Sequence, residues 1–267
     1  MSRPTGSAAE AAVRPGIERL ASLIAEARSV VALTGAGISV PSGIPDFRSP
    51  GTGLWEKVDP MEVAHIDVFR RSPQRFWHFY GERFASLGSR EPNDAHRALV
   101  ELEGMGRVDA VITQNIDMLH RKAGTRELVE VHGSIARAVC LECGGSAPAD
   151  EVRERLAASD DGLPRCECGA VLKPDVVLFG EFLPVHAMER AQELCAGADV
   201  LLCVGSSLEV YPVAGLPLLT RDHGGAVAII TAGPTPLDGL ASVRLDGDVV
   251  DELTALVAVL RAHGADG

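Results

Sequence analysis

The feature that most constrains the fold is a short apolar run followed at once by small residues. Residues 30–33 read Val-Val-Ala-Leu, and residues 34–39 read Thr-Gly-Ala-Gly-Ile-Ser. A short apolar run before a glycine turn is typical of a strand buried in a parallel sheet. Small residues after such a strand let backbone N–H groups approach a pyrophosphate closely. The pattern predicts a nucleotide site at the end of this strand.

The residues after this turn differ from those of an ordinary dinucleotide fold. Such a fold continues into a helix and places an acid at the end of the next strand, about 20 residues on. Here residues 40–51 contain three prolines and two glycines, which disfavour a helix interior. Glu56 and Asp59 lie near the expected distance, but neither ends a strand-like run. We expect these residues to form a loop that folds over the dinucleotide. Such a loop indicates a protein that acts on its dinucleotide chemically and does not only exchange a hydride with it. The loop carries Asp46, Phe47 and Arg48.

Short apolar runs alternate with amphipathic segments along most of the chain. This alternation predicts an α/β fold, a Rossmann-like parallel sheet with helices on both faces. Strands are expected at residues 30–33, 108–113, 128–131, 176–179, 199–204, 226–230 and 242–245. Helices are expected at residues 17–27, 61–70, 73–86, 93–104, 186–196, 212–220 and 249–262.

Two segments interrupt the alternation and predict a small second domain. Residues 54–104 contain helical patterns without a convincing strand, and residues 137–172 contain paired cysteines. The large domain is then assembled from residues 15–53, 105–136 and 173–267. Residues 1–14 are expected to form a disordered tail, because they lack the apolar core of a secretion signal.

Composition excludes several classes of function. The formal charge of −12 argues against non-specific nucleic-acid binding and is compatible with cationic, lysine-bearing partners, although it also fits a purely solubilising surface. No apolar stretch approaches the length of about 20 residues that a membrane span requires. We therefore expect a cytoplasmic protein without nucleic-acid or membrane partners, and a monomer is favoured.

Four of the six cysteines form two close pairs. Cys140 and Cys143 make a C-x₂-C pair, and Cys166 and Cys168 make a C-x-C pair. Two such pairs in a loop-rich cytosolic segment are typical of a zinc site with four thiolates. The alternative is four unpaired thiols. Because four thiolates leave no open coordination position, we expect the zinc to be structural. Cys195 and Cys203 are expected in the core, on a helix and a strand.

Polar residues follow three of the predicted strands. Residues 113–117 read Thr-Gln-Asn-Ile-Asp, and their side chains are costly to bury without partners, which indicates a ligand. His132 ends the third strand beside Gly133, where an imidazole is placed to exchange a proton. A surface or core histidine is the alternative. Residues 205–208, Gly-Ser-Ser-Leu, offer phosphate or ribose contacts, or equally a helix cap.

Taken together, these segments resemble the sirtuin family of NAD-dependent protein-lysine deacylases. The matching segments are GAGIS at 35–39, GIPDFRS at 43–49, TQNID at 113–117, HG at 132–133, the cysteine pairs, KPDVVLFGE at 173–181 and GSSLEVYPVA at 205–214. They occur in the family order within residues 17–260. A joint match of this kind is far more specific than a single glycine motif.

The resemblance implies a reaction and the residues that carry it. The acyl group of an acyl-lysine protein would pass to ADP-ribose, with release of nicotinamide. NAD would be the co-substrate and Zn²⁺ a structural ion. The catalytic residues would be His132, as general base on a ribose hydroxyl, and Asn115. The cofactor-binding residues would be Gly35, Ala36, Gly37, Asp46, Phe47, Arg48, Gln114, Asn115, Ile116, Asp117, Gly205, Ser206, Ser207, Thr231 and Val249. The peptide would pair by strand addition with Val177, Leu178, Phe179, Gly180 and Glu181.

The sequence departs from the family pattern in three places, and alternatives stay open. The second cysteine pair is shorter than usual, and Thr231 replaces a usual asparagine near the adenosine. Leu54 and Lys57 stand where some members carry a Tyr-x-x-Arg pair for acidic acyl groups, which favours acetyl over succinyl. The alternatives are a protein ADP-ribosyltransferase and a non-catalytic NAD-binding module. A hydride-transferring dehydrogenase fits less well, because the ribose acid and crossover helix are missing.

Overall fold

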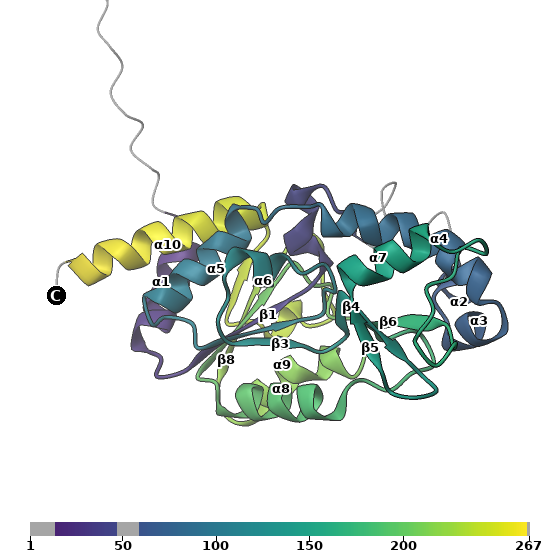
Figure 1. Cartoon of the computed structure of the whole chain (residues 1–267). Helices are drawn as coiled ribbons and strands as arrows, with labels where there is room; N and C mark the ends of the chain where they lie inside the picture. Colours follow the sequence, from purple (N-terminus) through teal and green to yellow (C-terminus); the bar gives the residue numbers. More distant parts are fainter. Residues whose placement is uncertain (1–13, 47–58, 266–267) are drawn as a thin grey trace, which may run out of the picture.

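The computed structural model describes residues 14–46 and 59–265 (Figure 1). Of the predicted site residues, Phe47 and Arg48 lie outside these ranges, as do Leu54 and Lys57. The expected tail also lies outside them, apart from Arg14. Within the described residues, no helix is long and apolar enough to cross a membrane.

A six-stranded parallel sheet forms the centre of the molecule. Its strands are β1 (Val30–Thr34), β2 (Ala110–Thr113), β3 (Leu128–Glu130), β7 (Val200–Val204), β8 (Ala226–Ile230) and β9 (Val243–Leu245). They lie in the order β3-β2-β1-β7-β8-β9, and every neighbouring pair is parallel. Counted along the chain, this is the order 3-2-1-4-5-6 of a Rossmann fold. The order reverses between β1 and β7, which is where such sheets bind ligands.

Helices cover both faces of this sheet (Figure 1). One face carries α1 (Pro15–Glu26), α5 (Asp94–Gly104) and α10 (Val249–Ala265), and the other carries α8 (Val185–Gly197) and α9 (Leu216–Asp222). Alternate residues of β1 enter different cores: Val30 and Ala32 pack in the first, Val31 and Leu33 in the second. Because both sides of the strand are buried, the sequence reads as a continuous apolar run.

A smaller antiparallel sheet lies at the end of the molecule away from the start of α1 (Figure 1). It contains β5 (Ser146–Pro148), β4 (Gly133–Cys140) and β6 (Leu172–Val176), in the order β5-β4-β6. Helices α2 (Pro60–Val63), α3 (Ile66–Arg71), α4 (Pro73–Gly88) and α7 (Ala149–Ala157) lie beside it. Phe76 and Trp77 of α4 share an apolar core with Ile135 of β4 and Leu172 of β6.

Three expected elements differ from the structure. The strand expected at 176–179 is wrong, since β6 ends at Val176. Pro174 is tolerated in β6 because this is an edge strand of the small sheet. The single helix expected at 61–70 is split at His65, whose Nδ1 accepts a hydrogen bond from the Asp67 N–H and caps α3. In addition to these three differences, β4 and β5 form where no strand was expected.

The third difference concerns the proline-containing segment after β1. Residues Ala36–Ser42 form a 3₁₀ helix in place of the start of the expected loop. Pro41 has no N–H to donate to the Ile38 carbonyl, and the side chain of Asn93 donates to that carbonyl instead, at 2.8 Å. The helix ends at Gly43, whose φ is +77°. The side chain of the residue that caps α5 therefore supports the 3₁₀ turns that the prolines were expected to exclude.

Candidate active site

The loops that follow β1 and β7 meet at the reversal point of the large sheet. The Gly37 N–H donates to the Gly205 carbonyl at 2.8 Å. A Cβ on Gly37 would lie 2.8 Å from Gly205 backbone atoms, and one on Gly205, whose φ is +59°, would overlap the Ile38 nitrogen. These glycines are therefore required by the contact between the two loops. The contact brings residues 35–39 and 205–208 to one edge of the sheet.

A buried hydrogen-bond network joins the loop after β1 to the loop after β2. The Asn115 Nδ2 donates to the Gly35 carbonyl at 3.0 Å and to the Ser39 hydroxyl at 3.1 Å. The Ser39 hydroxyl donates to Asp117 Oδ2 at 2.6 Å. Asp117 also accepts from the Leu119 N–H, and burial raises the pKa of its carboxyl group. Ser39 lies within the matched GAGIS segment but was not among the predicted site residues.

Gln114 and Ser206 connect the same edge to the loop after β7. The Gln114 Nε2 donates to the Ser206 hydroxyl at 2.9 Å, and that hydroxyl accepts the Leu208 N–H at 3.2 Å. No helix begins directly after β7, so Ser206 does not act as the helix cap that the sequence left open. The structure thus brings together Gly35, Gly37, Gln114, Asn115, Asp117 and Ser206.

His132 lies at the same edge and is held through its ring. Its Nδ1 lies 2.9 Å from the Gln114 carbonyl oxygen. Because a carbonyl only accepts, Nδ1 must carry the proton, and in the neutral ring the lone pair is on Nε2. Burial lowers the pKa of His132, although the Gln114 carbonyl opposes this effect. A neutral imidazole with a free lone pair at Nε2 is able to act as a general base.

Gly133 allows β6 to pass directly beside this histidine. Gly133 has a φ of +74°, and a Cβ there would overlap the Asp175 carbonyl oxygen. The Val177 N–H donates to the His132 carbonyl at 2.9 Å. The ring of His132 is therefore held by the Gln114 carbonyl, and its backbone by the chain leaving β6.

The five residues expected to pair with a peptide form a turn in this structure. The Leu178 carbonyl accepts the Glu181 N–H at 3.0 Å, and Gly180 between them has a φ of +84°. Phe179 forms an isolated bridge with His65, and its N–H donates to the Ala64 carbonyl at 2.9 Å. Only part of this segment is extended. Strand addition over the segment stays a prediction.

Four further residues were predicted to bind the cofactor, and their positions are as follows. Asp46 is the last described residue before residue 59. The Ile116 carbonyl accepts the Ile135 N–H at 3.1 Å, and the Thr231 N–H donates to the Leu245 carbonyl at 3.1 Å. Val249 begins α10, is buried and packs in the core of the large domain. Its side chain is therefore not presented to a ligand, which leaves its backbone for that role.

The four paired cysteines converge as a zinc site requires. The Sγ atoms of Cys140, Cys143, Cys166 and Cys168 all lie within 4.8 Å of one another. The Cys140–Cys168 and Cys143–Cys166 distances are 3.5 and 3.6 Å. Four Zn–S bonds of about 2.3 Å in a tetrahedron place the sulfur atoms about 3.8 Å apart. The shorter C-x-C pair thus still gives a set that fits Zn²⁺. Cys195 and Cys203 are buried in the core, as expected.

Two buried histidines support the strand ends below the site. The rings of His96 on α5 and His120 on α6 (Leu119–Ala123) lie 4.8 Å apart between centroids. The Nε2 of His120 lies 2.9 Å from the Thr34 hydroxyl, which donates to the Thr113 hydroxyl at the end of β2. Burial lowers the pKa of His96 to about 4 and that of His120 to about 3. Both rings are neutral at neutral pH.

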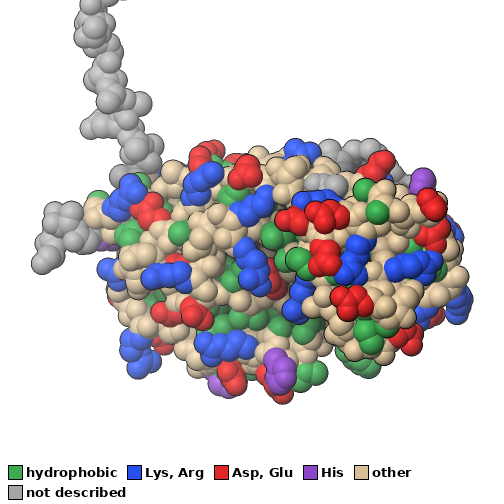
Figure 2. Space-filling view, in the orientation of Figure 1, with side chains coloured by type: hydrophobic (Ala, Val, Ile, Leu, Met, Phe, Trp, Pro, Cys, Tyr) green, Lys and Arg blue, Asp and Glu red, His purple; other side chains and the backbone are tan. Residues whose placement is uncertain are grey.

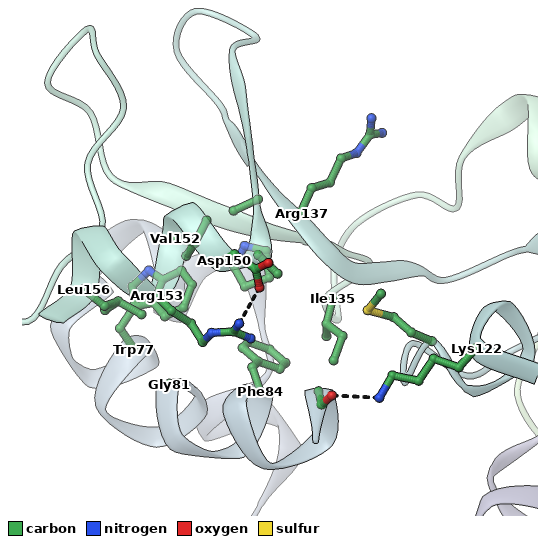
Figure 3. Close-up of a pocket in the computed structure, with 15 residues that line it drawn as sticks. Trp77, Gly81, Phe84, Lys122, Ile135, Arg137, Asp150, Val152, Arg153 and Leu156 are labelled. Atoms are coloured by element: carbon green, nitrogen blue, oxygen red, sulfur yellow. Dashed lines mark hydrogen bonds and ion pairs between the residues drawn. The ribbon is translucent and has the colours of Figure 1, made fainter. Parts of the chain in front are cut away.

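A separate cleft of about 280 Å³ lies between α4, α7 and β4 (Figure 3). Trp77 and Phe84 of α4 line it with Val152 of α7, and Arg153 pairs with Asp150 one turn earlier on the same helix. None of the predicted site residues lines this cleft. It lies beside the antiparallel sheet, and Met118 and Lys122 also line it.

Comparison with known proteins identifies the family. The model of the Sir2 family matches residues 35–212, which is more than half of the chain. The chain belongs to the Sir2 family. It is 43% identical over 247 residues to an NAD-dependent protein deacetylase of Sulfurisphaera tokodaii, covering 92% of this chain and 96% of that relative.

Solved Sir2 structures share the fold. A structure described as Sir2 with a p53 peptide and NAD⁺ superposes with a TM-score of 0.83 at 38% identity, covering 93% of this chain and 99% of that one. A Sir2 protein bound to a propionylated peptide gives a TM-score of 0.82 at 38% identity, covering 93% and 98%. The Rossmann-like sheet and the four-cysteine module are therefore those of a Sir2-family protein.

Proposed function

We propose that this chain is an NAD-dependent protein-lysine deacylase. It transfers the acyl group from lysine to ADP-ribose and releases nicotinamide. The observation that carries the proposal is the placement of His132, whose Nδ1 is fixed by the Gln114 carbonyl at the edge where residues 35–39 and 205–208 meet. Relatives named as NAD-dependent protein deacetylases support the assignment.

His132 is the general base of this reaction. The acyl oxygen attacks the anomeric carbon as nicotinamide leaves, and a ribose hydroxyl then attacks the former acyl carbon. Addition of one water molecule and cleavage of the bond between that carbon and the lysine nitrogen then release the free lysine and O-acyl-ADP-ribose. The Nε2 of His132 accepts the proton of that hydroxyl, which its tautomer and lowered pKa allow. Asn115 and Asp117, joined through Ser39, surround the nicotinamide and its ribose, and Gln114 contacts the ribose hydroxyls.

The remaining contacts to NAD complete the proposed site. Backbone N–H groups of residues 35–37 and the Arg48 side chain hold the pyrophosphate, Ser206 and Ser207 hold the phosphate and adenosine side, and Phe47 covers the nicotinamide. Zn²⁺ in the four-cysteine site stabilises the fold of residues 137–172 and takes no part in the chemistry, since four thiolates fill its coordination shell. Residues 54–104 and 137–172 form the small domain.

The substrate is an acyl-lysine peptide with an uncharged acyl group. Solved relatives described as bound to acetylated and propionylated peptides support this class. Phe182 and Val185 follow the predicted peptide segment and are 97% and 65% exposed, which gives apolar contacts for a peptide. On the face shown in Figure 2, basic and acidic side chains are interspersed, so this face offers no basic surface for nucleic acid. We place the protein in the cytoplasm, where a reducing environment keeps the four thiols available for zinc. We favour a monomer.

One experiment tests reaction type and acyl choice together. The protein is incubated with NAD and matched peptides that carry acetyl-, propionyl- or succinyl-lysine, and products are identified by mass. We expect equal amounts of free-lysine peptide, nicotinamide and O-acyl-ADP-ribose from the acetyl peptide. Faster removal of succinyl would contradict the acyl preference. ADP-ribose attached to protein without dependence on acyl-lysine would favour the transferase.

A further inference from the structure

Lys173 is a buried lysine beside the segment expected to receive the peptide. It is 4% exposed, and its Nζ lies 2.9 Å from Glu181 Oε2. The same Nζ donates to the carbonyls of Val176 at 2.7 Å and Pro174 at 3.2 Å. Three acceptors thus surround the three protons of one ammonium group. A buried charge is tolerated only when it is paired and hydrogen-bonded in this way.

The choice of lysine is itself informative in this chain. Only three of its 25 basic residues are lysines. The acceptors around Lys173 come from three residues and converge on one point, which suits a compact ammonium group. A planar guanidinium presents a wider fork of donors and would not meet three converging acceptors in the same space.

Glu181, the partner of this lysine, closes the turn that follows β6. Its Oε2 accepts the Leu178 N–H at 2.9 Å, while its own N–H donates to the Leu178 carbonyl at 3.0 Å. Gly180 supplies the left-handed conformation within the turn. The ion pair therefore connects β6 to the turn of residues 178–181 and fixes both ends of that turn.

The turn also joins the two parts of the proposed active site. Phe179 accepts the Ile66 N–H at 2.9 Å from the helical insertion, and Val177 donates to the carbonyl of His132. The side chain of Phe179 is 40% exposed at this position. A displacement of the turn would therefore change the distance between a bound peptide and the general base.

We infer that Lys173 and Glu181 are positioning residues that hold the turn of residues 178–181 in the conformation that receives the acyl-lysine peptide. The inference rests on the proposed function. Neither residue needs to contact NAD, because their side chains bind each other and the backbone of residues 174, 176 and 178. The effect of removing the pair is therefore specific to the peptide.

The test removes the pair without leaving a buried charge. The double variant Lys173→Met/Glu181→Gln keeps an amide oxygen for the Leu178 N–H. We expect its KM for an acetyl-lysine peptide to rise about tenfold or more, since a misplacement of about 1 Å can cost about 10²-fold. The KM for NAD should stay within about twofold, because only peptide binding is affected. The control Arg190→Met/Glu193→Gln removes an exposed ion pair of α8 and should change neither constant.

Three results would separate the possible outcomes. An unchanged peptide KM in the folded double variant, or equal changes in both KM values, would overturn the inference while leaving the proposed function intact. A wild-type protein without deacylation would overturn both. If the double variant does not fold, Lys173→Met alone removes the buried ammonium and leaves the carboxylate of Glu181, which is the more exposed partner, on the Leu178 N–H. A selective rise in its peptide KM would support the inference, and its absence would overturn it.

Discussion

The Nδ1 of His132 lies 2.9 Å from the carbonyl oxygen of Gln114. The contact joins two segments that the sequence presents as separate polar motifs after neighbouring strands. It assigns the ring proton to Nδ1 and leaves Nε2 able to accept a proton. A backbone atom of one proposed ligand-binding residue therefore orients the proposed base.

Replacing His132 by alanine should abolish turnover while leaving the fold intact. General-base help contributes about 10²–10⁴-fold, so we expect kcat to fall by at least the lower figure. NAD binding by calorimetry should persist, because the proposed pyrophosphate and adenosine contacts come from other residues, and zinc content should persist, because the metal ligands are the four cysteines. His186→Ala, at a fully exposed histidine, is the control. Near wild-type turnover of His132→Ala would contradict the assigned role.

The pH dependence of deacylation should report the buried state of His132. Its pKa is lowered from 6.5 by burial, and only the neutral ring accepts a proton. Activity is therefore expected to be retained below pH 6.5 and lost as the pH falls through the lowered value. The measurement is kcat/KM for an acetyl-lysine peptide across the acid limb. An apparent pKa at or above 6.5 would show that the base is not this buried imidazole.

The buried pair of His96 and His120 should make the free energy of unfolding depend on pH in the acidic range. Their folded pKa values, about 4 and about 3, lie below the ordinary 6.5. As the pH falls, these two histidines therefore bind protons in the unfolded chain before they do so in the folded chain. The stability is fully present above pH 6.5 and is lost as the pH falls toward the folded values. Each ring should lower the free energy of unfolding by about 1.4 kcal/mol per pH unit in this range.

The variant His96→Leu separates this contribution from that of the carboxylates. It should weaken the dependence of unfolding free energy on pH between pH 7 and 5, measured by denaturant titration. The apolar side chain is suitable because neither ring nitrogen of His96 has a hydrogen-bond partner among the described residues. His186→Gln should leave the slope unchanged. An unaltered slope in His96→Leu would refute the assignment.

Removal of zinc should unfold the cysteine module. We expect one zinc per chain by metal analysis, and loss of ordered structure and activity on chelation, since such sites supply about 10–16 kcal/mol of apparent binding energy. Cys166→Ser should lose the metal, whereas Cys195→Ala, in the core of the large domain, should retain it. Full zinc retention by Cys166→Ser would be inconsistent with a four-thiolate site.

Two glycines with positive φ provide a matched test of the contact beside His132. Gly133 and Gly124 have φ values of +74° and +97°. An added Cβ meets nothing within 4 Å at Gly124, but overlaps the Asp175 carbonyl at Gly133. Gly124→Ala should cost about 1–2 kcal/mol from its left-handed backbone alone. Gly133→Ala should cost more and also lower kcat. If Gly133→Ala and Gly124→Ala changed the free energy of unfolding and kcat equally, the close contact between Gly133 and the Asp175 carbonyl would be excluded.

The large sheet could be predicted from the sequence because its central strands are buried on both faces. Residues 30–33 and Val200–Val204 are continuously apolar runs and form β1 and β7, whereas the reversal of the strand order between these two strands has no signal in the runs themselves. The antiparallel sheet was harder to detect. Strand β6 contains Lys173 and Pro174, which do not indicate a strand, and Lys173 is buried only because Glu181 lies beside it.

The polar residues of the site could be identified, but their geometry could not. Residues at the ends of parallel strands meet at one edge, which predicted that Gln114, Asn115 and His132 would converge. The orientation of His132 depends on a backbone carbonyl, which every residue possesses, so the side-chain pattern carries no signal for it. The role of Ser39 as a bridge to Asp117 likewise depends on the 3₁₀ helix that the prolines had argued against.

Strand β4 begins at Gly133, directly after the proposed base, and ends at Cys140, the first of the four thiols. One uninterrupted piece of backbone therefore carries both the proton acceptor and a metal ligand. The cysteine module is therefore not structurally independent of the proposed active site. Replacing it by the module of a relative would also change the strand that follows His132 and helps to hold its imidazole.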